Sequence, residues 1–328
     1  MPKSHTPSTL KPGIPKPSLL KRVESKMFIF AHRKTLVLLD GEYGSVFKGR
    51  SLDFDELRAY IPGDEVRDID WKATARHGAP LVKSYVAVRR QNVLLVTDTG
   101  RNMAATAASG ETKRDIVVQA LGVMGYLAHR HGDAVGLVHG NATVTRTIPA
   151  RKGEDHLERI LREVDQHTNL DGGPSGIAHQ LDFVLRHIKQ RSLMVVVADE
   201  FLPGPETETL LRRLHSRHEL IWFTVHDASL ASEPGAGETE IPDSIDVADG
   251  AFLPALAVRS EAVRAAYATA SREREARRQD TYRRLGIAEG NAGSSHEVVP
   301  ALFALLEQHK TRSQNGGIQA RKRQHRAG

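Results

Sequence analysis

From residue 93 onward the chain alternates between short apolar runs and longer segments with helical periodicity. Val93–Val96 is one such run and is followed closely by Asp98, and Ser192–Ala198 is another, directly before Asp199. Apolar runs of this length, rich in β-branched residues and bounded by turns, are typical of strands that are buried on both faces. We therefore expect two central strands of a parallel sheet, with Asp98 and Asp199 at their carboxyl ends.

Further strands and helices complete an alternating pattern. Gly140-Asn141 joins two strand-like runs and is a strong hairpin signal, which places one antiparallel strand at a sheet edge. Strands are expected at Ala134–His139, Thr143–Ile148, Glu219–Val225 and, weakly, 245–247, and helices at Thr112–His131, Glu154–Val164, Ile177–Lys189, Pro205–Arg217, 257–285 and Val299–His309. Such alternation predicts a three-layer α/β fold with a mostly parallel central sheet and right-handed crossovers.

The N-terminal third follows a different pattern. Residues 1 to about 20 are rich in Pro, Lys, Ser and Thr, and the last 18 residues are basic and polar, so both ends are expected to be disordered. Between Gly41 and Val88, glycines and turn signals argue against long helices, and Leu81–Val88 alternates like a strand. The expected division is a disordered segment 1–35, a β-rich subdomain 36–90, an α/β domain 91–310 and a disordered tail 311–328.

Composition narrows the functional classes. The chain is 40% hydrophobic and 26% charged, as in ordinary soluble globular proteins, and its net charge of +6 lies partly in the two ends. It has no cysteine, which excludes disulfides and cysteine-ligated zinc and is compatible with the cytoplasm, where we expect the protein to be. No apolar run approaches the roughly 20 residues of a spanning helix, so no transmembrane segment is expected.

Motifs of common enzymes are absent from the sequence. The loop Asp171–Gly176 has glycines but no following Lys-Ser/Thr, so it does not match a phosphate-binding loop, and no GxSxG nucleophile elbow occurs. His129 and His131 lie two apart without an HExxH motif, which favours surface or helix-capping histidines over zinc ligands. We therefore expect a protein that is not an enzyme.

Three oxygen-bearing side chains are expected to meet at one rim of the sheet. Asp98 and Asp199 end two central strands, and Ser175 lies in the loop before the helix that leads to the Asp199 strand. Ligands of open α/β sheets bind at this edge, and carboxylates and hydroxyls suit hard cations such as Mg²⁺. The alternative is that each Asp simply caps the following turn or helix.

Two resemblances become specific at this point. The C-terminal two-thirds resembles a von Willebrand factor type A domain, and residues 36–310 as a whole resemble the bacterial family called domain of unknown function 58. The family motif, close to Arg-x-Tyr-x-Pro-Gly-Asp-x-x-Arg-x-Ile-Asp-Trp followed by Thr/Ser-Ala-Arg, is matched by Arg58, Tyr60, Pro62, Gly63, Asp64, Arg67, Ile69, Asp70, Trp71, Thr74, Ala75 and Arg76.

The von Willebrand resemblance implies a metal-ion-dependent adhesion site, with an Asp-x-Ser-x-Ser loop, a Thr and a second Asp. In this chain Gly100 and Asn102 stand where the serines are expected, while Asp98, Ser175 and Asp199 would supply the other ligands. The site is therefore expected to be degenerate and to bind Mg²⁺ or Mn²⁺ weakly or not at all, with the charge of Arg101 competing with the metal.

The family resemblance also implies a function. Members resemble non-enzymatic partners of MoxR-type AAA+ ATPases that act in the assembly or maturation of a client protein, here unidentified. We expect binding through the rim with Asp98, Asn102 and Asp199.

The segment Arg58–Arg76 is either a network of Arg–carboxylate pairs that fixes the β-rich subdomain against the α/β domain, or a docking surface. The rival function is binding of nucleic acid or acidic surfaces by the basic ends.

Overall fold

A six-stranded sheet forms the centre of the protein. The computed structural model describes residues 17–30, 33–46, 52–61, 64–65, 68–87, 91–228, 244–254 and 260–324. The strand order is β10-β7-β6-β3-β4-β5, and only β5 is antiparallel to its neighbour. The strands are β3 Asn92–Asp98, β4 Ala134–Gly140, β5 Thr145–Arg151, β6 Leu193–Ala198, β7 Glu219–Val225 and β10 Ala288–Ala292. This confirms the predicted α/β fold and its antiparallel edge strand.

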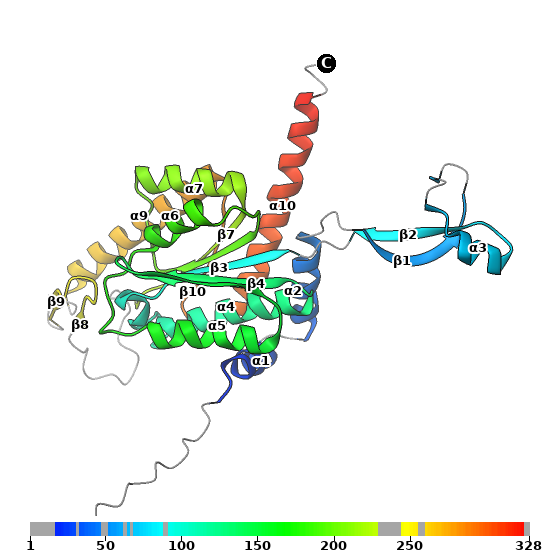
Figure 1. Ribbon diagram of the computed structural model, residues 1–328. Helices are drawn as coiled ribbons and strands as arrows, with labels where there is room; N and C mark the ends of the chain where they lie inside the picture. The colour runs from blue at the N-terminus through cyan, green and yellow to red at the C-terminus, as the bar shows by residue number, and fades with distance from the viewer. Residues whose placement is uncertain are drawn as a thin grey trace, which may run out of the picture.

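Helices cover both faces of this sheet (Figure 1). Because side chains alternate along a strand, Val93 and Leu95 of β3 join the core under one helical layer, and Leu94 and Val96 join the core under the other. The first layer consists of α1 Leu19–Phe30, α2 Arg33–Val46, α4 Lys113–Arg130, α5 Glu154–His167 and α10 Val298–Gln324. The second consists of α6 Ile177–His187, α7 Pro205–Arg217 and α9 Glu261–Leu285.

Smaller elements lie at the ends of these layers. A short 3-10 helix, Arg101–Ala104, follows β3, and β8 Ser244–Ile245 pairs with β9 Phe252–Leu253. None of the helices in the described part of the chain is long and apolar enough to cross a membrane.

Helix α1 corrects the expectation that residues 1–35 are disordered. One face of this helix is buried against α4 and α5 through Leu19, Leu20, Val23 and Met27. Glu158 of α5 accepts the backbone N–H groups of Leu19 and Leu20 at 3.1 and 2.8 Å, which satisfies donors that a helix start leaves open. Val23 packs so closely on Gly122 that a Cβ there would lie 2.6 Å from Val23 Cγ2. Tertiary contacts thus order a segment whose composition suggested disorder.

Helices α2 and α10 correct two further boundaries. Residues 36–46 belong to α2 and pack on α10 rather than on a β-rich subdomain, with Leu39 and Tyr43 buried in the main core. Residues 311–324, expected as a disordered tail, continue helix α10. The ion pair between Lys310 Nζ and Glu42 Oε2, at 3.0 Å, links the two helices. Residues 1–16 and 325–328, which were also expected to be disordered, lie outside the described part of the chain.

The family motif lies in a separate arm between α2 and β3. The arm consists of β1 Leu52–Ala59, α3 Trp71–His77 and β2 Leu81–Ala87, and β1 and β2 are antiparallel. Strand β2 confirms the strand predicted at Leu81–Val88, whose last residue lies outside the described part of the chain. Figure 1 shows the arm standing apart from the α/β domain.

Candidate functional site: an acidic rim closed by a lysine

The predicted rim exists at the carboxyl ends of β3, β6 and β7. Strands β3 and β6 are parallel neighbours with Thr97 opposite Val197, so Asp98 and Asp199 leave the sheet at the same edge. Asp227 follows the next strand, β7. We call Asp98, Asp199 and Asp227 the acidic rim. The prediction that these two strand ends converge is confirmed, while Asp227 was not singled out from the sequence.

Asp98 uses both carboxylate oxygens to hold the loops around it. Oδ1 accepts the backbone N–H of Gly100 and Oδ2 accepts that of Gly176, each at 2.5 Å. The Ser175 hydroxyl also hydrogen-bonds to this carboxylate. Gly176 is the N-cap of α6, so Asp98 stabilises both its own turn and the start of that helix. This is the capping role that was the alternative to metal binding.

The loop with Ser175 explains why a glycine follows Asp98. A Cβ on Gly100 would lie 2.5 Å from Ser175 Cα and 2.6 Å from Ser175 N, which no side chain can accept without displacing the backbone. Asn102 donates its backbone N–H to Ser175 Oγ at 3.3 Å, but its own Oδ1 is buried without a hydrogen-bond partner. The structure therefore brings Asp98, Asn102 and Ser175 together, as predicted, in a closely packed arrangement.

Lys113 pairs with the other two carboxylates of the acidic rim, Asp199 and Asp227. Its ammonium lies 2.9 Å from Asp199 Oδ1 and also bonds Asp227 Oδ1, and its side chain is only 1% exposed. Lys113 is the first residue of α4, where a cation opposes the positive end of the helix dipole. Two carboxylates offset that unfavourable position. The neutralising charge at the rim thus comes from Lys113, whereas the sequence suggested Arg101.

Burial dominates the protonation equilibria here. It raises the pKa of Asp98 to about 6, with a further contribution from the charge of Asp199, and it likewise raises the pKa of Asp227 to about 6. Burial alone would lower the pKa of Lys113, but the charges of Asp199 and Asp227 outweigh it and raise that pKa. Lys113 therefore stays protonated at pH 7.

A divalent cation does not fit this rim. Both Asp98 oxygens accept backbone N–H groups, the Gly100 position has no room for a hydroxyl ligand, and an ammonium already pairs with Asp199. A metal ion next to Lys113 would meet a like charge at short range. Of the two expected versions of the degenerate adhesion site, weak or absent, the arrangement favours the absent one.

Restoring the missing serine is expected to damage the rim rather than to repair it. Gly100→Ser should lower the free energy of unfolding by about 1–3 kcal/mol, because the new side chain overlaps the Ser175 backbone. Urea denaturation measures this change. Gly204→Ser is the matched control, since Gly204 is an N-cap with nothing near its Cβ position and serine is favoured there. Magnesium binding gained by Gly100→Ser would contradict the steric argument.

The family motif stabilises the arm from within. The Arg58 guanidinium forms two hydrogen bonds of 2.8 and 2.7 Å with Asp64, which also accepts the Ile61 N–H and has its pKa lowered mainly by Arg58. Asp70 caps α3 by accepting the N–H groups of Lys72 and Ala73, both at 3.0 Å. The Arg58–Asp64 pair is thus inside the arm, which corrects the expectation that it fixes the arm against the α/β domain. Pro62, Gly63 and Arg67 lie outside the described residues.

The same arm exposes its aromatic residues. Trp71 is 63% exposed, and the consecutive residues Tyr60 and Ile61 are exposed as well. Arg76 donates its Nε–H to the carbonyl of Lys72 at 3.2 Å. Trp and Tyr are enriched among the residues that contribute most to binding in protein interfaces. The docking interpretation of this segment therefore remains a prediction.

Tryptophan fluorescence can test the exposure of the arm. The chain has two tryptophans, and Trp222 is fully buried. Acrylamide should quench the wild-type emission strongly and the Trp71→Phe emission weakly, because only the buried indole remains in the variant. Equal quenching of both proteins would mean that Trp71 is covered in solution.

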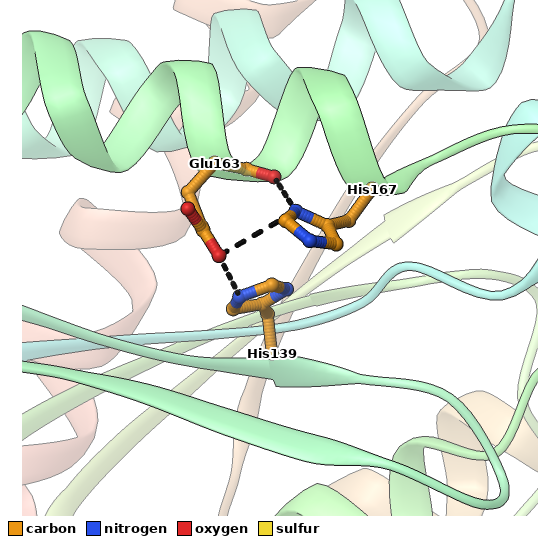
Figure 2. A group of neighbouring side chains, drawn as sticks. All are labelled: His139, Glu163 and His167. Carbon is orange, nitrogen blue, oxygen red and sulfur yellow. Dashed lines mark hydrogen bonds and ion pairs between the residues drawn. The ribbon is translucent and has the colours of Figure 1, made fainter.

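Sequence reasoning missed a second cluster, formed by His139, Glu163 and His167. His139 is on β4 and the other two are on α5, and Figure 2 shows the three side chains pointing toward one another. Burial lowers the pKa of His139 to about 4, so its imidazole is neutral at pH 7. The available signal was the i, i+4 spacing of Glu163 and His167.

The two histidines that the sequence analysis considered as zinc ligands lie elsewhere. His129 pairs with Glu154 at 3.5 Å and His131 lies 3.4 Å from Asp40.

Sequence comparison identifies relatives over most of the chain. Residues 56–277 match the family described as "Protein of unknown function DUF58". The uncharacterized protein Rv1480 of Mycobacterium tuberculosis is 29% identical over 265 residues, which cover 80% of this chain and 83% of that protein. The uncharacterized protein Mb1516 of Mycobacterium bovis gives the same values.

The solved structures that match part of this chain have low sequence identity to it. An aerotolerance-related membrane protein from Bacteroides fragilis superposes with a TM-score of 0.41 and 11% identity, covering 66% of this chain and 99% of that one. A von Willebrand factor type A protein from Catenulispora acidiphila gives a TM-score of 0.36 and 7% identity, covering 69% of this chain and 44% of that one.

Proposed function

The chain belongs to the DUF58 family, and on that premise we propose that it is a non-enzymatic protein-binding module whose docking surface is the edge of the sheet around the acidic rim. The pairing of Lys113 with Asp199 and Asp227 supports this proposal. A general base or metal ligand needs a carboxylate that readily accepts a proton or an ion. Asp199 Oδ1 accepts both the Lys113 ammonium and a backbone N–H, and the positive charge beside it disfavours a further proton or metal ion. Asp98 is similarly engaged by the backbone.

Exposed apolar side chains on the loops of this edge carry the proposal. Val144, Leu170 and Leu202 are 47%, 58% and 41% exposed, and they lie in the loops that follow β4, α5 and β6. The loop with Leu170 leads to Ser175, and the loop with Leu202 begins at Asp199. Single exposed leucines are ordinary, but apolar residues on adjoining loops around charged groups resemble the mixed composition of protein interfaces.

We propose a MoxR-type AAA+ ATPase as the partner, acting together with this chain on a client protein that is still to be identified. The partner class is inferred from the family resemblance, and the proposed binding site is the rim with Asp98, Asn102 and Asp199. The exposed Tyr60 and Trp71 of the arm would form a second contact surface for the ATPase or the client.

A pull-down with a MoxR-type ATPase from the same genome tests the proposal. Leu170→Ser combined with Leu202→Ser should abolish capture without unfolding the protein, because both side chains are exposed. Val263→Ser, at an exposed apolar position on α9, is the matched control and should bind like the wild type. Capture that survives both the double variant and alanine at Asp98, Asn102 and Asp199 would exclude the rim as the docking surface.

The rival function, binding of nucleic acid by the basic ends, has less support. In the KRVESK segment, Arg22 pairs with Asp115 at 3.2 Å and Lys26 donates to Ser295 at 3.0 Å, so internal contacts use two of its cations. Deleting residues 311–328 would separate the two functions. A salt-dependent gel shift with bulk DNA that disappears on this deletion would favour the rival.

A further inference from the structure

Three side chains of the metal-binding type converge between helix α5 and the hairpin of β4 and β5 (Figure 2). One atom each of His139, Glu163 and His167 lies within 4.8 Å of the other two. Glu163 and His167 are four residues apart on α5 and so share one face of that helix, which covers the strand bearing His139 (Figure 2). This group is separate from the acidic rim.

The separations suit coordination better than hydrogen bonding. His139 Nε2 lies 3.4 Å from Glu163 Oε1, whereas a charge-assisted hydrogen bond is typically about 2.7–2.9 Å long. Two ligands of a tetrahedral zinc ion, each bonded at about 2.05 Å, are roughly 3.3 Å apart. The observed distance therefore matches one edge of such a coordination shell.

An unsatisfied nitrogen provides the second observation. His139 is fully buried, and its Nε2 is poorly satisfied, because its contact with the Glu163 carboxylate, at 3.4 Å, is too long and misaligned for a good hydrogen bond (Figure 2). Leaving a buried polar atom unpaired costs about 1–3 kcal/mol, which a bound ion would offset. The other nitrogen, Nδ1, lies 3.4 Å from the Thr99 hydroxyl.

The hydrogen bonding of His167 is compatible with a ligand role for one of its two nitrogens. Its Nδ1 lies 2.8 Å from the backbone carbonyl of Glu163, and as a donor there it leaves Nε2 available. Imidazoles that bind metals commonly donate their other N–H to a carbonyl in this way. The side chains of Glu163 and His167 are 28% and 32% exposed, so an ion can enter from solvent.

We propose that His139, Glu163 and His167 bind a divalent transition-metal ion of the zinc class, with a water molecule as fourth ligand. Two imidazoles and one carboxylate suit zinc better than magnesium or calcium, which prefer oxygen ligands. The ion would tie strand β4 to helix α5. Arg146 is opposite His139 on β5, and its positive charge opposes the ion, so the expected affinity is micromolar.

Titration of the full-length, tag-free chain after treatment with a chelator tests the site. Calorimetry should give one Zn²⁺ per chain, and Co²⁺ should give the visible absorption of a four-coordinate ion. Glu163→Gln and His167→Gln should each weaken binding at least tenfold, and both should fold because these side chains are partly exposed. Circular dichroism verifies the fold.

His129→Gln is the matched control. His129 and Glu154 are a histidine–carboxylate pair at a similar distance, 3.5 Å, but they belong to no three-ligand group among the described residues. This variant should bind Zn²⁺ like the wild type. A wild-type chain without stoichiometric binding, or equal binding by Glu163→Gln and His167→Gln, would overturn the proposal.

Discussion

Replacing Lys113 with methionine is expected to lower the free energy of unfolding by about 3 kcal/mol, measured by urea denaturation. The variant removes the ammonium that pairs with Asp199 and Asp227 and leaves these carboxylates to repel each other and Asp98. Breaking a buried ion pair typically costs about 3–5 kcal/mol, and the low end applies because Asp227 is half-exposed. Lys189→Met, at an exposed lysine, is the control and should change stability little.

The same variant tests the relation between the lysine and a metal ion. Without the ammonium, the acidic rim becomes a cluster of carboxylates, and Mg²⁺ or Mn²⁺ should then bind and restore part of the lost stability. The wild type should give no heat of binding with either ion. Millimolar or tighter binding by the wild type that Asp98→Ala abolishes would mean that the rim is a working metal site.

Truncating the buried face of α1 should have the largest effect on stability. Leu20→Ala combined with Met27→Ala is expected to lower the free energy of unfolding by about 4 kcal/mol or more, since each such truncation in a core costs about 2–5 kcal/mol. Both side chains are nearly fully buried in the main core. Chemical denaturation of the full chain measures the change.

Matched positions on the same helix provide the control. Phe28 and Ile29 are 66% and 74% exposed, so alanine at these two positions should leave stability nearly unchanged. If the two double variants were equally stable, α1 would not be docked on the domain in solution.

The α/β domain could be predicted from the sequence because its strands and helices have clear periodicity. The run Leu193–Ala198 is entirely buried, and its pattern alone indicates a central strand. Strand β10 was missed because its five residues, AEGNA, have low strand propensity. Its position depends on tertiary contacts, including the buried pair of Arg278 with Glu289 at 2.8 Å.

The sequence predicted only those residues of the acidic rim that directly follow a buried strand. Asp98 and Asp199 follow directly from two buried strands, whereas the partners of Lys113 are 86 and 114 residues away and no local pattern indicates them. A lysine at the first position of a helix was nevertheless a usable signal, because such a charge needs compensation. His139 was missed since its partners come from a different element.

The packing of α2 against α10 has a consequence for the synthesis of the protein. Lys310 and Glu42, which join the two helices, are 268 residues apart, so α2 can complete its packing only after α10 has been synthesised. Until then the packing of Leu39 and Tyr43 of α2 in the main core is incomplete. Domains with such distant contacts fold late and expose aggregation-prone surfaces meanwhile. The nascent chain should therefore depend on chaperones until α10 has been synthesised.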